Sequence, residues 1–173
     1  IYRIWGAIKQ GVQYVQDIDS ALTELKKVTD ETDETYARFL KTMAQTGANV
    51  GATTSDLTNM AASWARLGYS IEEAGDLAKS TAVLLNVSEF TDADKASEAL
   101  ISTIQAFGYA AKDSMHVVDV LNEIGNNFAI SSDGIATALQ DSASSLMAAG
   151  NNLEQSVALV AAAIFYGCSY RNI

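Results

Sequence analysis

Apolar residues recur along most of the chain at the three- and four-residue spacing of an amphipathic helix. Residues 36–44, for example, place apolar side chains at positions i, i+3, i+4, i+7 and i+8, which is one face of a helix. The same spacing predicts seven further helical faces, over residues 4–25, 57–67, 71–85, 93–107, 117–124, 135–146 and 157–164. We therefore expect an all-α fold of about eight amphipathic helices, packed as helical hairpins and without a sheet.

Glycines interrupt this pattern about every forty residues. Gly68, Gly108 and Gly150 each follow an apolar helix end and precede a short polar turn, at spacings of 40 and 42 residues. Glycine adopts the left-handed conformation at a helix C-terminus without a Cβ clash, so we expect these three residues to be structural turns. Gly47 follows the helical face of residues 36–44 and is expected to be a fourth. An aliphatic residue stands nine positions after each of the first three glycines: Leu77, Val117 and Leu159.

The first thirty residues carry a different repeat, in which apolar or small residues alternate at steps of four and three. That alternation is the a/d seam of a coiled coil, maintained here for about three heptads. Two interpretations remain open: the helix packs on the rest of the domain, or it continues upstream into a longer coiled coil that joins copies of the chain. The seam comprises Gly11 and six candidate oligomer contacts: Ile4, Ile8, Val15, Ile18, Leu22 and Leu25.

These patterns divide the chain into three parts. Residues 1–30 form a heptad-bearing N-terminal helix, residues 31–166 a helical-hairpin core domain, and residues 167–173, which lack periodicity, an irregular tail. Because the chain starts at Ile1 and not at Met, we expect a processed product, a fragment or an excised segment.

Composition and charge argue against several classes of function. Eleven Lys and Arg against 21 Asp and Glu give a formal net charge of −10, and no basic stripe is visible. We therefore expect no direct binding to nucleic acid or to an anionic membrane. The longest apolar run, residues 157–166, is about half the length that spans a bilayer.

Candidate catalytic residues are few. His116 is the only histidine and Cys168 the only cysteine, so we expect an ordinary helix residue and a free thiol. Asp92 and Asp94 are better explained as acids at a helix start than as an acid/base pair. Neither a phosphate-binding loop nor a calcium loop occurs. We expect no enzymatic activity, no cofactor and no metal.

Several helix-stop and helix-start motifs occur in a specific order over some 150 residues. They are residues 18–28 (IDSALTELKKV), 46–57 (TGANVGATTSDL), 64–70 (WARLGYS), 99–108 (ALISTIQAFG), 126–131 (NNFAIS) and 146–150 (LMAAG). With these motifs in this order, the stretch from about Tyr14 to Ala163 resembles the helical core domain of phage tail tape measure proteins. The resemblance ends after Ala163, where a frame change, a truncation or an added tail would account for the departure.

The resemblance implies a structural role in a phage or prophage. Members of that family lie inside the tail tube of long-tailed phages, assemble in the bacterial cytoplasm, and set the length of the tail by their own length. The partners implied are other copies of the chain and tail tube or tail assembly proteins. An α-solenoid-like protein–protein interaction module is the alternative, because periods of 40 and 42 residues fall within the range of armadillo-like arrays.

Overall fold

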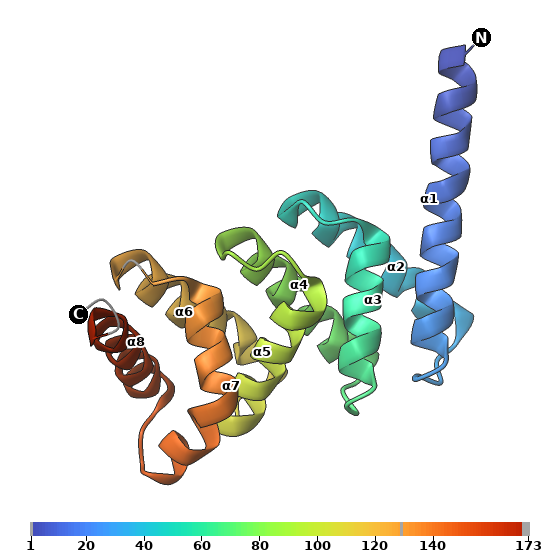
Figure 1. Cartoon of the computed structure of the whole chain (residues 1–173). Coiled ribbons are helices and arrows are strands. Elements are labelled where there is room, and N and C mark those ends of the chain that lie inside the picture. Colours follow the sequence, from blue (N-terminus) through green and yellow to red (C-terminus); the bar gives the residue numbers. More distant parts are fainter. Residues whose placement is uncertain (1, 129, 171–173) are drawn as a thin grey trace. The chain divides into compact units, whose positions relative to one another are not determined.

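The computed structural model describes residues 2–128 and 130–170, and side chains for residues 10–128 and 130–167. These residues form eight α-helices and one short 3-10 helix, with no strand among them, which confirms the expected all-α class (Figure 1). In chain order the elements are α1 (Tyr2–Lys26), α2 (Asp33–Val50), α3 (Thr54–Ala65), α4 (Ile71–Val87), α5 (Ala93–Phe107), η1 (Ala111–Asp113), α6 (Ser114–Phe128), α7 (Ser132–Ala148) and α8 (Leu153–Tyr170).

The chain divides into two compact units, residues 1–79 and 80–173, with the boundary inside α4. In the first unit α1 packs mainly on α3, and in the second α5 packs mainly on α7 while α6 packs on α8. Because the chain reverses direction at each turn, a helix comes to lie beside the helix two places further along the chain. Helices adjacent in sequence also touch, as α2 does α3 and α7 does α8. This is the packing of successive helical hairpins.

The buried face of each helix mixes a few large side chains with many alanines. Trp64 is fully buried in the first unit and meets Tyr69 edge-on, with ring centroids 5.6 Å apart. Leu100, Leu121 and Leu139 are fully buried in the second unit. Buried alanines lie between these large residues, among them Ala61, Ala74, Ala78, Ala96, Ala99 and Ala136. Such small residues let neighbouring helices approach closely.

Three of the turn glycines stand at the ends of odd-numbered helices in the left-handed conformation. Gly68 follows α3 with φ of 93°, Gly108 follows α5 with φ of 69°, and Gly150 follows α7 with φ of 89°. The spacing of 40 and 42 residues is therefore the distance from the end of one odd-numbered helix to the end of the next.

Gly47 does not form the structural turn that the sequence predicts. Helix α2 continues through Gly47 to Val50, and Gly51, with φ of 73°, caps it. The Gly47 carbonyl accepts hydrogen bonds from the amides of Gly51, at 2.8 Å, and Ala52, at 3.1 Å. Because the chain folds back so tightly, a Cβ on Gly47 would collide with the backbone carbonyl oxygen of Ala52. Glycine is thus required here for close approach and not for its φ.

The predicted irregular tail is also wrong for residues 167–170, since α8 continues to Tyr170. Loss of apolar periodicity does not itself end a helix, and no proline interrupts these residues. Residues 171–173 lie outside the described part of the chain.

Reciprocal capping boxes open two of the three helices that follow the turn glycines. At α4 the Ser70 amide donates to the Glu73 carboxylate at 3.0 Å, and the Glu73 amide donates to the Ser70 hydroxyl at 3.3 Å. At α8 Asn152 and Gln155 exchange the same pair of bonds, at 3.1 and 2.9 Å. The matched residue before α6 is Ala110, which makes no side-chain cap, and the chain there begins with the 3-10 turn η1.

We expect Gly47→Ala to destabilise the protein by about 1–3 kcal/mol, because the added methyl forces the Ala52 carbonyl to move. Gly11→Ala is the matched control, since Gly11 is also helical and a Cβ there meets nothing within 4 Å. It should stabilise the protein by up to about 1 kcal/mol through helix propensity. Urea unfolding of both variants measures the difference, and equal effects would contradict the close approach.

We expect Ala110→Ser to stabilise the protein by about 1 kcal/mol, because Ala110 already has the extended backbone of an N-cap, with φ of −79° and ψ of 157°. The serine hydroxyl would accept from the first free amides of the following turn. Ser70→Ala, which removes an existing cap, should cost a similar amount. Thermal unfolding followed by circular dichroism compares the two, and a neutral Ala110→Ser would show that η1 needs no cap.

Candidate association surface and groove

The N-terminal seam is buried at one end and exposed at the other. Leu25 is fully buried, Ile18 and Leu22 are partly buried, and Val15 is 64% exposed. The backbone of Ile4 and Ile8 lies in α1, but their side chains are outside those described. The structure therefore brings only the C-terminal seam residues into the core.

The length of α1 explains this division. Its 25 residues give a helix of about 37 Å, whereas the 12 residues of α3 span about 18 Å. Two contacts fasten the shared region: the Tyr14 and Thr54 hydroxyls lie 3.0 Å apart, and Arg66 forms an ion pair with Glu24 at 3.1 Å. Beyond them α1 extends past α3, and Val12 is 52% exposed (Figure 1).

Polar contacts hold the base of α1 against the start of α2. The hydrogen bond from Lys27, together with the nearby Arg66, keeps the pKa of Glu24 below its ordinary value. Lys26 forms an ion pair with Asp33 at 3.0 Å and lies 4.9 Å from the centroid of the Tyr36 ring. Several polar contacts thus hold the C-terminal end of α1 in place.

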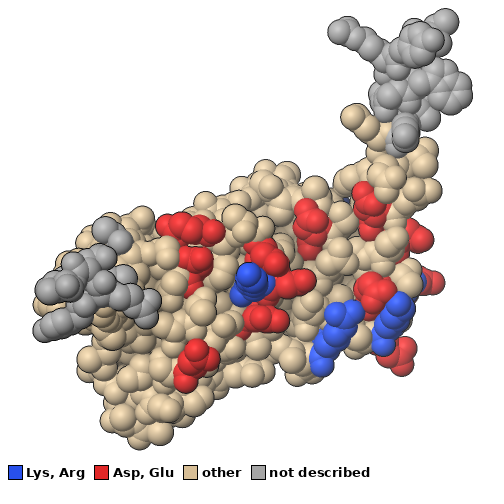
Figure 2. Space-filling model, in the orientation of Figure 1, with Lys and Arg blue, Asp and Glu red and all other residues tan. Residues whose placement is uncertain are grey.

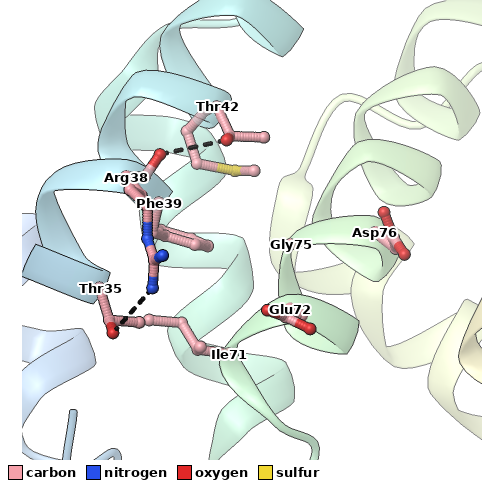
Figure 3. Close-up of a pocket in the computed structure, with 9 residues that line it drawn as sticks. Thr35, Arg38, Phe39, Thr42, Ile71, Glu72, Gly75 and Asp76 are labelled. Atoms are coloured by element: carbon pink, nitrogen blue, oxygen red, sulfur yellow. Dashed lines mark hydrogen bonds between the residues drawn. The ribbon is translucent and has the colours of Figure 1, made fainter. Parts of the chain in front are cut away.

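A groove of about 400 Å³ lies between α2 and the first half of α4 (Figure 3). Its floor is apolar, since Phe39, Met43 and Ile71 line it and are buried. Arg38 stands on the α2 side, while Glu72 and Asp76 stand on the α4 side. The groove therefore offers an apolar floor between a basic and an acidic rim.

Two hydrogen bonds order the α2 rim. The Arg38 guanidinium donates to the Thr35 hydroxyl at 3.4 Å, and the Thr42 hydroxyl donates to the Arg38 carbonyl at 3.1 Å (Figure 3). The apolar floor of the groove suits an apolar side chain of a partner protein.

The groove was not predicted from the sequence, although one signal was present. Gly75 lies in the middle of α4, and a Cβ there would come within 3.1 Å of Met43 Cε and 3.3 Å of Phe39 Cε2. A glycine inside a helical pattern often marks such a close approach.

A second hollow, of about 310 Å³, lies between the starts of α5 and α7 and is mainly polar. One of its acids is already engaged, because Glu89 accepts a hydrogen bond from the Ser132 amide at 2.8 Å and so caps α7. Asp92 likewise accepts from the Asp94 amide at 2.9 Å. Among the side chains described, no group of three His, Cys, Asp or Glu residues could hold a metal ion.

His116 links α6 to α8. Its Nε2 lies 2.9 Å from Glu154 Oε1, and its ring meets Tyr109 edge-on at 5.8 Å. Burial, and then the charges of Glu154 and Asp113, raise the pKa of Tyr109. His116 and Glu154 are both about half exposed, so this is a solvated structural contact of modest strength.

The charged side chains form no basic stripe on the face that Figure 2 shows. On the face shown in Figure 2 acidic residues are spread widely and basic residues are few, which agrees with the net charge of −10. This face has nothing that would follow a phosphate backbone.

The chain matches a known protein family. The model of the family described as phage-related minor tail protein matches residues 40–166. The match runs from the middle of α2 into α8 and leaves α1 outside it. No solved structure matches the chain.

The divided seam predicts effects of very different size on stability for two of its residues. Leu25→Ala should destabilise the protein by about 2–5 kcal/mol, because Leu25 is fully buried, whereas Val15→Ala should change stability by less than about 0.5 kcal/mol. Chemical denaturation of the two variants measures this. A large loss from Val15→Ala would mean that the exposed half of α1 is covered.

Proposed function

Because the chain belongs to the family of phage-related minor tail proteins, we propose that it is a structural domain of a tape measure protein, which takes part in tail assembly and in setting tail length. The family match over most of the hairpin array is the observation that carries this proposal. The order of turn motifs along the same residues supports it.

The continuous helix α1 suits a protein that sets a length, as a molecular ruler does. A helix extends by about 1.5 Å per residue whatever its sequence, so a continuous helix converts chain length directly into distance. The seam of α1 has the heptad spacing by which helices associate with one another in coiled coils. The exposed residues Val12 and Val15, in the middle of α1, would supply apolar contacts to such a helix.

The proposed partners follow from these surfaces. Other copies of the chain would bind the exposed half of α1, and tail tube or tail assembly proteins would bind the acidic hairpin surface. The proposed locations are the lumen of the phage tail and, during assembly, the cytoplasm of the bacterial host. None of the helices described has the length and apolar character needed to cross a membrane.

The proposed role is non-enzymatic. The two carboxyl groups with lowered pKa values have structural explanations: Glu24 is held by Lys27 and Arg66, and Glu73 caps α4. The segment would act through its packing surfaces, and no cofactor is proposed for it.

A protein–protein interaction module is the second candidate, and the groove between α2 and α4 is the observation that favours it. Its apolar floor would take a side chain of a partner while Arg38, Glu72 and Asp76 contact the flanking polar groups. Under this alternative the partner recognises the groove, and the length of α1 has no effect on function.

Lengthening α1 in the phage gene tests the ruler. An insertion of about 28 residues, or four heptads in the register of the seam, ahead of Val12 adds about 42 Å of helix. We expect tails longer by about that amount, measured by electron microscopy of purified particles.

Val12→Ala with Val15→Ala is the matched control, because it changes the same region without changing its length. Tails of unchanged length are expected from this control whenever they form. Normal tails of unchanged length from the insertion itself would rule out the ruler and leave the interaction module.

A further inference from the structure

The groove between α2 and α4 carries an excess of negative charge. Its lining holds two acids, Glu72 and Asp76, against one base, Arg38, and all three are exposed. The first turn of α2 adds Glu34, immediately before the lining begins at Thr35. The mouth of the groove is therefore acidic above an apolar floor.

Arg38 does not neutralise the acidic rim of the groove. Its guanidinium donates to the Thr35 hydroxyl at 3.4 Å, which is a contact within α2. Among the side chains described, no ion pair joins Arg38 to Glu72. The charge of Glu72 is thus available to a cation that approaches from outside.

The first sixteen residues have the opposite charge. They contain Arg3 and Lys9 and no acid, so all 21 acids of the chain lie in residues 17–173. Ile4, Ile8 and Val12 occur at steps of four, which is the spacing of one helix face. We call residues 1–16 the basic start of α1. It combines apolar residues at helical spacing with a charge of +2, in a chain whose net charge is −10.

The groove is not filled by α1 of the same chain. Helix α1 is one continuous helix that packs on α3, where the Tyr14 and Thr54 hydroxyls lie 3.0 Å apart. None of the described α1 side chains lines the groove. An occupant of the groove therefore comes from another molecule.

We propose that the basic start of α1 in one copy binds the groove between α2 and α4 of another copy. A helix that lays its apolar face into a groove is a common mode of recognition. The apolar floor of Phe39, Met43 and Ile71 receives apolar side chains, and the acids Glu72 and Asp76 attract the cations. Two basic starts that met each other would instead bring like charges together.

This contact joins two different surfaces, so it is heterologous. A copy whose groove is filled still has its own basic start free, and copies can therefore add in a row. The proposal rests on the proposed association of copies through the exposed half of α1, and it names the surface that receives this half. A groove of about 400 Å³ accepts only one or two large side chains, so we expect a weak contact.

A fluorescein-labelled peptide of residues 1–16, acetylated and amidated at its ends, tests the contact when it is titrated with the full chain. We expect saturable binding, measured by fluorescence anisotropy, with a Kd of about 10–100 µM. Glu72→Lys should weaken it at least about fivefold, because attraction becomes repulsion. Glu123→Lys is the matched control, since Glu123 is exposed, undergoes the same change of charge and lies on α6.

The control should leave the Kd within about twofold of its original value. Circular dichroism confirms that both variants stay folded. Equal losses from Glu72→Lys and Glu123→Lys would overturn the proposal, because the peptide would then respond to total charge and not to the groove.

A charge-inverted peptide gives a second measurement that does not depend on weakening alone. Arg3→Glu with Lys9→Glu keeps its length and its apolar residues. This peptide should bind the original chain at least about tenfold more weakly and should regain affinity for the Glu72→Lys chain. Equal binding of the two peptides to the original chain would overturn the proposal.

Sedimentation velocity of the full chain from about 1 to 500 µM tests the contact between whole copies. We expect species larger than a dimer at high concentration, and Glu72→Lys should remove them. A monomer at every concentration would overturn the proposal. Association that Glu72→Lys leaves unchanged would also overturn it, but would leave the proposed association through α1 standing. Tail lengths test the proposed ruler separately.

Discussion

The array of helical hairpins depends on the left-handed backbone that follows α3, α5 and α7. At each of these three ends, amides that turn back over the helix bond its last carbonyls, and a positive φ permits this. Gly68, Gly108 and Gly150 meet that requirement. Because the reversal is short, α6 packs on α5 and α8 packs on α7. The buried alanines are a consequence, since closely spaced helices leave little room between their axes.

The sequence predicts the parts of the fold that local rules control. The all-α class follows from apolar spacing, and the turns at Gly68, Gly108 and Gly150 follow from glycine between a helix stop and a polar helix start. Gly47 shows the same local pattern as these three glycines. Glycine is required there for a different reason, because the backbone of Ala52 folds back against it. A single sequence does not distinguish a glycine needed for φ from one needed for space.

The candidate surfaces are less predictable because they depend on which helices meet. The heptads of α1 read the same along their length, yet α3 is only long enough to cover the C-terminal half, so Leu25 is buried and Val15 is not. The groove arises where Gly75 faces Phe39 and Met43, residues that are more than thirty positions away. Leu159 shares its repeat position with Val117, and only the structure shows that one is exposed and the other buried.

The fastening of α1 has a mechanical consequence. The N-terminal part of this helix extends past α3, and the Tyr14–Thr54 contact lies near the point where the two helices separate. A force along the axis of α1 loads its whole interface with α3 in shear, so the apolar contacts and the Glu24–Arg66 ion pair resist together. A force across the axis peels the same contacts one after another, starting at Tyr14. The attachment of α1 to α3 therefore resists a pull along the helix axis better than a pull across it.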